Sequence, residues 1–158
     1  MESTLKNKFL EKAIILREDG RFDQAIKFLN DGLAKFDNNS DVFALLSHVC
    51  ILNDDLKNAS LYLEKAKDVD PYSALVGWNE VRLLLKNMNV SEATIVARRT
   101  HLRFPDDIEG LGVLGSCLRA SNLIEESLFY LEKAISLNPC YAEAFINRGL
   151  IKLSQKDF

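Results

Sequence analysis

The side chains best suited to catalysis or metal binding are those of two histidines and three cysteines: His48, His101, Cys50, Cys117 and Cys140. His48 and Cys50 are two positions apart, so on a helix their side chains diverge and cannot ligate one metal ion together. None of the five has the Cys/His spacing of a zinc site. A cysteine nucleophile would require Cys50 or Cys117 to be exposed beside a base, and the sequence does not indicate this. We therefore expect no metal and no cofactor.

Two acidic pairs, Glu125-Glu126 and Asp106-Asp107, stand where helices are expected to begin. Carboxylates at a helix start stabilise the helix dipole, so we interpret these pairs as helix-start residues and not as an acid/base pair. The sequence has no glycine-rich phosphate loop and no dinucleotide-binding pattern. These observations predict that the chain is not an enzyme.

The amino-acid composition indicates which partners and which cellular compartment to expect. The net charge is −3, which argues against a nucleic-acid partner because such proteins usually carry a basic excess. No apolar run approaches the roughly 18 residues of a membrane span, and residues 1–10 lack the pattern of a secretory signal. An odd number of widely spaced cysteines is typical of reduced thiols. We therefore predict a cytoplasmic protein with no membrane span.

An internal repeat organises the chain. Pro71, Pro105 and Pro139 recur at one constant spacing, and other positions at this spacing keep their character. Small residues are expected where two helices approach closely, and large apolar residues where a side chain fills a gap. One apolar column is Phe22, Leu56, Val90, Ile124 and Phe158; two mostly small columns are Ala13, Ser47, Val81, Gly115, Gly149 and Ala25, Ala59, Ala93, Ser127.

Within one period the apolar spacing is helical. Phe9, Ala13 and Leu16 are four and three positions apart, which places them on one helix face, and a second such set follows later in the period. Helix-ending or helix-capping residues separate the two sets. The predicted unit is therefore helix, short turn, helix, longer turn, with the short turns at residues 19–21, 53–55, 87–89 and 120–122.

This pattern resembles the tetratricopeptide repeat family over about residues 6–158. The resemblance implies an all-α fold, a right-handed α-solenoid of antiparallel helix pairs with a 34-residue period. We predict a single domain over 1–158, with repeats 6–39, 40–73, 74–107 and 108–141 and the first helix of a fifth repeat at 142–158. The third repeat departs most from the pattern, since Gly77 stands where a large residue is usual.

The resemblance also implies a protein-interaction scaffold that binds a peptide or protein segment on a concave surface lined by the first helix of each repeat. Arg82 and Arg119 could both reach a carboxylate, although the alternative for each is a solvated or intramolecularly paired position. Trp78 could lie accessible beside Ala44 and Gly112, or could fill the core. The predicted peptide-binding residues are Trp78, Asn79, Arg82, Leu85, Arg119 and Asn147.

Two further points follow from the same resemblance. The asparagines Asn79 and Asn147 could bond a neighbouring helix as well as a ligand. The lysine and asparagine that some family members use to clamp a chaperone's C-terminal carboxylate are absent, because Leu10 and Ile14 stand at these places in the first repeat and no later repeat restores them. We therefore expect no chaperone-tail binding.

The last predicted helix is unusually apolar on its surface. This pattern fits either a segment of a longer solenoid or a helix that packs against a partner or a second copy, giving a homo-oligomer. Two alternative functions therefore remain: the non-catalytic N-terminal superhelix of a larger enzyme such as a glycosyltransferase, and a module that assembles with itself. The apolar residues concerned are Phe145, Ile146, Leu150, Ile151 and Leu153.

Overall fold

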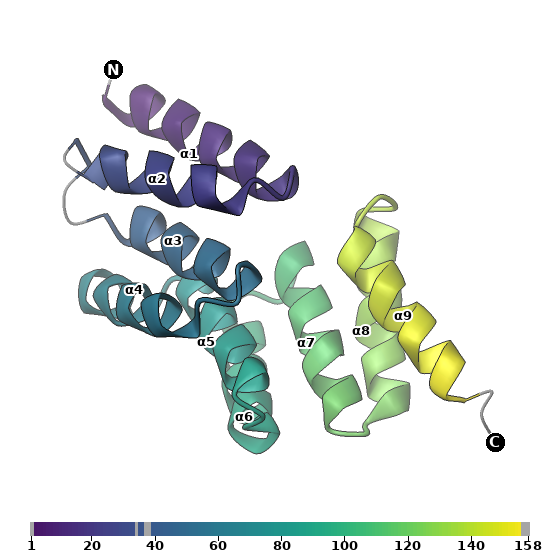
Figure 1. Cartoon of the computed structure of the whole chain (residues 1–158). Coiled ribbons are helices and arrows are strands. Elements are labelled where there is room, and N and C mark those ends of the chain that lie inside the picture. Colours follow the sequence, from purple (N-terminus) through teal and green to yellow (C-terminus); the bar gives the residue numbers. More distant parts are fainter. Residues whose placement is uncertain (1, 34, 37–38, 156–158) are drawn as a thin grey trace. The chain divides into compact units, whose positions relative to one another are not determined.

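The described part of the chain is built of helices. In the computed structural model, residues 2–33, 35–36 and 39–155 are described, and they contain no strand (Figure 1). This confirms the predicted all-α class. The helices are α1 (Glu2–Glu18), α2 (Phe22–Leu33), α3 (Ser40–Leu52), α4 (Leu56–Val69), α5 (Ala74–Lys86), α6 (Val90–Arg103), α7 (Ile108–Ala120), α8 (Ile124–Leu137) and α9 (Ala142–Ser154).

Equivalent helices begin at a constant spacing. Successive starts among α3, α5, α7 and α9 are as far apart as the three prolines, and the same holds among α2, α4, α6 and α8. Helix α1 begins at Glu2, before the expected start of the first repeat. The apolar position Phe158 lies outside the described residues. The single domain over 1–158 and its repeat boundaries stay predictions.

The short turn inside each helix pair has the same backbone feature. A residue just after the first helix adopts a positive φ: 70° at Gly20, 58° at Asp54, 60° at Met88 and 59° at Asn122. A left-handed residue at this place lets following N–H groups bond the last carbonyls of the helix, as Asp55 N does to Cys50 O at 2.9 Å. Glycine, aspartate and asparagine tolerate this conformation, whereas Met88 adopts it at a steric cost.

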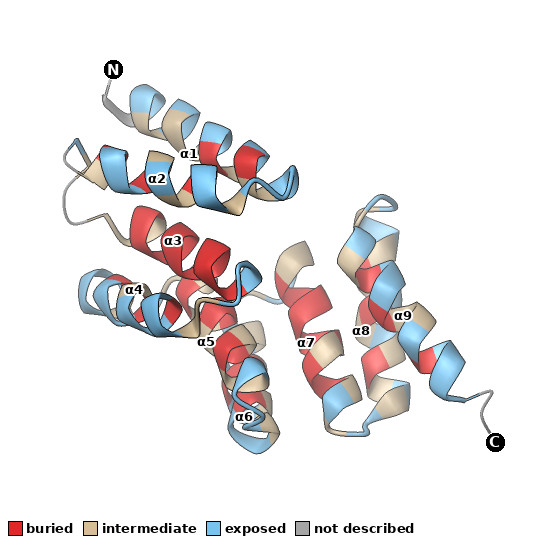
Figure 2. Ribbon diagram, in the orientation of Figure 1, coloured by how far each residue is buried: buried red, intermediate tan, exposed pale blue. Residues whose placement is uncertain are grey.

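The helices group into two compact units, residues 1–79 and 80–158, whose boundary falls within α5. In the first unit, α3 is almost wholly buried (Figure 2). Phe9 of α1 stacks on Phe28 of α2 with 4.7 Å between ring centroids, and Gly32 lies against the same ring. The core residues of this unit are Ala13, Leu16, Ala25, Leu29, Val42, Leu45, Leu46 and Val49.

The small-residue columns mark the closest approach of paired helices. In the first unit, Ser47 Oγ of α3 donates to Ala59 O of α4 at 2.9 Å. In the second unit the serine is on the other helix, because Ser127 Oγ of α8 donates to Gly115 O of α7 at 2.6 Å. A small side chain brings the two backbones near enough for this bond. In each of these two helix pairs, therefore, one serine side chain bonds the backbone of the partner helix where the helices cross.

The core of the second unit joins α7, α8 and α9. It contains Leu111 of α7, Leu131 and Ala134 of α8, and Ala144 and Ile151 of α9, each 0% exposed. The expectation that Ile151 belongs to an open apolar face is therefore wrong. Ile151 is seven positions after Ala144, so it lies on the same inward face of the helix.

Candidate functional site

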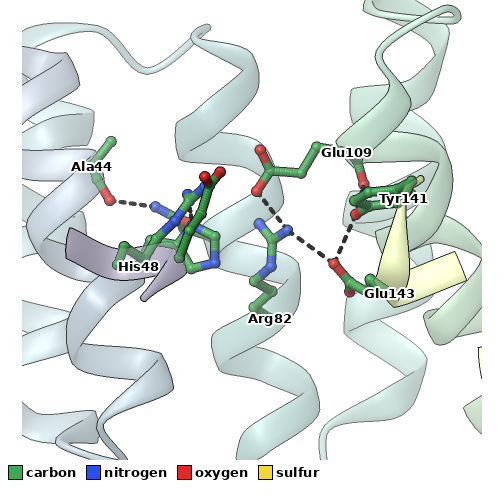
Figure 3. A network of polar contacts seen from close by, with 9 residues as sticks. Ala44, His48, Arg82, Glu109, Tyr141 and Glu143 are labelled. Atoms are coloured by element: carbon green, nitrogen blue, oxygen red, sulfur yellow. Dashed lines mark hydrogen bonds and ion pairs between the residues drawn. The ribbon is translucent and has the colours of Figure 1, made fainter. Parts of the chain in front are cut away.

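The predicted site residue Arg82 lies in an ionic network of the second unit. Its Nη2 is 2.7 Å from Glu109 Oε1 on α7 and 3.8 Å from Glu143 Oε2 on α9 (Figure 3). The Arg82 side chain is 11% exposed, and its Nη1 is buried with no hydrogen-bond partner among the described residues. The alternative of intramolecular pairing therefore holds for this arginine.

Tyr141 completes the network and fills the space beside Gly112. Its hydroxyl donates to Glu143 Oε2 at 2.7 Å, and burial, with help from the Glu143 charge, raises its pKa so that it stays neutral. A Cβ added at Gly112 would lie 2.5 Å from the Tyr141 ring. Gly112 therefore makes room for the Tyr141 ring.

Sequence reasoning did not find Tyr141, although one signal was present. Tyr141 directly precedes α9, where Asp107 and Ser73 precede α7 and α5. Small polar side chains are usual at such a position because they cap the helix. A large aromatic residue in that column could have indicated that the ring packs elsewhere.

The structure brings Arg119 and Asn147 together, as two of the predicted residues. Arg119 Nε on α7 donates to Asn147 Oδ1 on α9 at 3.2 Å. Asn147 Nδ2 donates to Glu143 O at 3.0 Å, which fixes the amide so that its oxygen faces the guanidinium. The Nη groups of Arg119 have no partner in the described part of the chain. Arg119 is therefore an oriented cation with two free donor groups.

The remaining predicted residues are placed differently. Trp78 is 1% exposed and Asn79 0% exposed, so both are interior side chains, and the core alternative holds for the indole. Burial of an aromatic side chain as large as this indole stabilises the fold. Asn79 Nδ2 donates to Ala44 O of α3 at 2.6 Å, which is a bond to a neighbouring helix. Leu85 is half-buried on α5.

The thiols in the helices are packed side chains. Cys50 and Cys117 are 1% and 0% exposed, whereas Cys140 is exposed. Burial, with the nearby Asp55 carboxylate, raises the pKa of Cys50 to about 11, and burial also raises the pKa of Cys117. A raised pKa keeps a thiol protonated and unreactive. The described residues also contain no group of histidine, cysteine, aspartate and glutamate that could hold a metal ion.

Helix α9 has an open apolar face. The exposed fractions are 40% for Phe145, 62% for Ile146, 43% for Leu150 and 63% for Leu153. A Cβ added at Gly149 would meet nothing within 4 Å. Figure 2 shows the contrast with α7, which is buried over most of its length. An apolar face of this kind is typical of an interaction surface.

Helix pairs repeated at one spacing define the class of protein, a helical-repeat solenoid. The tetratricopeptide repeat model matches residues 40–73 and 108–139. The resemblance found in the sequence is thereby confirmed for these two segments. No curated protein sequence matches the chain.

Solved structures share the fold. TTC0263 from Thermus thermophilus is 15% identical over 89% of this chain and 78% of its own, with a TM-score of 0.71. PilF of Pseudomonas aeruginosa is 18% identical over 99% and 71%, also with a TM-score of 0.71. YrrB, a TPR protein with an unusual peptide-binding site, is 19% identical over 94% and 76%, with a TM-score of 0.56. Identities this low show the fold alone.

One further finding concerns membranes. Among the described residues, no helix combines the length and the apolar character needed to cross a bilayer.

Proposed function

We propose that this chain is a protein-interaction scaffold that binds a peptide segment along the first helices of the second unit. The tetratricopeptide repeats support a protein-interaction scaffold, and YrrB, which shares the fold, is described as having a peptide-binding site. The observation that carries the proposal is the oriented but incompletely paired guanidinium of Arg119. A guanidinium with free donors suits a carboxylate or a main-chain carbonyl of a peptide.

The proposed contact positions are Leu85 and Arg119, which occupy equivalent places on α5 and α7, one repeat period apart. Both side chains are half-buried, so part of each faces solvent. Leu85 would supply an apolar anchor and Arg119 a charged one. Because Asn147 already orders the Arg119 side chain, binding would cost less conformational entropy there than at a mobile arginine.

The other predicted residues have supporting roles in this proposal. Asn147 orients Arg119, and Arg82 is neutralised by two glutamates. Trp78 and Asn79 lie in the interior and are not proposed to contact the peptide. We therefore expect substitution of Trp78 to act through stability, and substitution of Arg119 to act through binding.

The test is selection of peptides from a random display library on the protein, followed by affinity measurement with a selected peptide. Arg119→Ala should weaken binding at least tenfold, which is about 1.4 kcal/mol. The matched control is Arg99→Ala, an exposed arginine of α6 that lies 3.6 Å from Glu80, and it should leave the affinity unchanged. Failure to select any peptide, or equal affinities of the Arg119 variant and the wild type, would contradict the proposal.

A second candidate function, self-association through α9, is favoured by the open apolar face of that helix. Two copies that cover each other's α9 would remove this surface from water. Sedimentation velocity over a wide concentration range tests the idea. We expect a mass that rises with concentration towards a dimer, and a strict monomer at the highest concentration would count against it.

A further inference from the structure

Arg119 differs from other arginines of the second unit in the charge of its partner. Four arginines of this unit have a carboxylate oxygen 2.6–3.6 Å away: Arg82, Arg98, Arg99 and Arg148. Among the described residues Arg119 has no carboxylate partner, and its one hydrogen bond goes to the uncharged amide oxygen of Asn147 at 3.2 Å. The positive charge of Arg119 is therefore oriented but not neutralised.

The acid nearest to Asn147 along α9 is already engaged. Glu143 stands one helical turn before Asn147. Its carboxylate accepts from the Tyr141 hydroxyl at 2.7 Å and lies 3.8 Å from Arg82 Nη2 (Figure 3). Asn147 Nδ2 donates to the Glu143 main-chain oxygen at 3.0 Å, so an amide oxygen, and not a carboxylate, faces Arg119. This part of α9 therefore binds the guanidinium without supplying a counter-charge.

The surface of α7 beside Arg119 supplies no acid either. Ser116 stands three positions earlier, so the two side chains share one face of the helix. Ser116 is half-buried, and its hydroxyl has no hydrogen bond among the described residues. Leu85, at the equivalent place on α5, is apolar and half-buried. Neither position competes with a ligand for the charge of Arg119.

A half-buried cation without a counter-charge favours an anionic ligand over a neutral one. Partial burial weakens screening by water, so the attraction between opposite charges exceeds that of a fully exposed pair. A main-chain carbonyl would accept a hydrogen bond from an Nη group but would leave the charge uncompensated. A carboxylate accepts with both oxygens and neutralises the guanidinium, and such charge-assisted bonds are roughly twice as strong as neutral ones.

We infer that the peptide bound by this scaffold carries an aspartate or glutamate whose carboxylate pairs with the Nη groups of Arg119. This inference rests on the proposed peptide binding and adds the chemical class of the residue that Arg119 recognises. The equivalent places continue on both sides of Arg119, at Leu85 of α5 and at the exposed Leu153 of α9. A peptide that crosses these helices does not have to end at α7. The acid is therefore assigned to a side chain within the peptide, and not to the C-terminal carboxylate.

The first experiment identifies the acid in the ligand. Peptides are selected from an unbiased random display library on the wild-type protein, and the tightest is synthesised with a C-terminal amide, so that its carboxylates are side chains. We expect enrichment of aspartate or glutamate, and replacing the acid by its amide should weaken binding at least about tenfold.

Each other outcome of this selection overturns a defined part of the argument. Tight peptides that contain no acid would overturn the inference and leave peptide binding intact. A peptide that binds only with a free C-terminal carboxylate would overturn the side-chain assignment. Failure to select any peptide would overturn both the inference and the proposed function.

The second experiment tests whether the acid pairs with Arg119. Dissociation constants of the acidic peptide and of its amide counterpart are measured on the wild type and on Arg119→Gln, which keeps a polar side chain without the charge. Replacing the acid should cost at least about tenfold on the wild type and less than about twofold on Arg119→Gln. The matched control is Arg99→Gln on α6, which should show the preference of the wild type. An equal preference on the wild type and on Arg119→Gln would overturn the inference.

The third experiment supplies the missing counter-charge from the chain itself. Ser116→Asp places a carboxylate three positions before Arg119 on the same helix face, whereas Ser116→Asn has nearly the same size and no charge. Ser116→Asp should bind the acidic peptide at least about fivefold more weakly than Ser116→Asn, and both should bind the amide counterpart equally. Equal binding of the acidic peptide by two folded variants would overturn the inference. Circular dichroism shows whether both variants are folded, and the Arg119→Gln comparison does not depend on them.

Discussion

Helices α7 and α9 occupy equivalent places in successive repeats, yet their surroundings differ. Helix α7 is buried over most of its length, and its Gly115 is covered by Leu131 of α8. On α9 the buried residues are Ala144, Asn147 and Ile151, and Gly149 is open. The difference shows that a first helix owes its buried face to neighbours on two sides. The preceding pair covers one face, and the partner helix of the same repeat covers the other.

The largest expected effect is the difference in stability loss between a buried leucine of α8 and an exposed leucine of α9. Leu131→Ala removes a 0% exposed side chain of α8 that packs on Gly115, so it should lower the free energy of unfolding by about 2–5 kcal/mol. Leu150→Ala removes a 43% exposed side chain of α9 and should change the monomer's stability by no more than about 0.5 kcal/mol. Urea unfolding at a concentration where the protein is monomeric measures both. Equal losses of stability would mean that Leu131 and Leu150 do not differ in burial.

The two glycines should respond to alanine with opposite signs. At Gly115 the new methyl group would press on Leu131 inside the core, and the strain should cost about 1–3 kcal/mol. At Gly149 the methyl group enters open space, and replacing glycine in a helix interior should stabilise the monomer by about 0.5–1 kcal/mol. The shift in Tm of each monomeric variant gives the sign. A stabilised Gly115→Ala variant would show that the α7–α8 contact is looser than the structure indicates.

The serine at the α7–α8 crossing should have a smaller effect. Ser127→Ala removes the donor to Gly115 O at 2.6 Å, which should cost about 0.5–1.5 kcal/mol. Ser154→Ala at the end of α9 removes a bond to Ile151 O at 2.8 Å, but this serine is exposed, so water replaces the bond and the cost should be close to zero. Ser47→Ala in the first unit should behave as Ser127→Ala does, because it holds the equivalent crossing. Similar losses of stability for Ser127→Ala and Ser154→Ala would mean that burial does not determine how much these hydrogen bonds contribute.

Much of the fold follows from local sequence. The residue types at positions 20, 54 and 122 are those that accept a positive φ, so the short turns could be located, and Met88 was located by spacing alone. The small-residue columns predicted where helices cross, as at Ser47 and Ser127. These features depend on residues near one another in the chain or on a fixed spacing.

The candidate site could be predicted only in part. Spacing placed Arg119 and Asn147 on neighbouring first helices, and the structure brings them into contact. Spacing could not show that Glu109 and Glu143 neutralise Arg82, because those contacts join residues far apart in the chain through particular side-chain directions. The burial of Trp78 also depends on tertiary packing, which a periodic pattern does not contain.

The smallest expected effect concerns two ion pairs, one on each flank of α8. Arg98 of α6 donates two hydrogen bonds to Glu126 at 2.6 and 2.7 Å, and these bonds hold the pKa of Glu126 below its usual value. Arg148 of α9 donates one bond to Glu132 at 2.9 Å. Because the Arg98 and Glu126 side chains are 45% and 36% exposed, solvent screening limits the pair to about 0.5 kcal/mol or less.

The sign of the pH dependence follows from the lowered pKa of Glu126. A carboxyl group whose pKa falls on folding contributes stability that is complete above its unfolded-state pKa, about 4.3, and is lost as the pH falls through the folded-state pKa. Glu126→Gln should therefore reduce the free energy of unfolding slightly at pH 7 and leave it close to the wild type at about pH 3. Urea unfolding at both pH values measures the difference, with Glu132→Gln as the matched substitution on the α9 flank. A Glu126→Gln loss that is as large in acid as at neutral pH would mean that side-chain packing, and not the Arg98 charge, accounts for the effect.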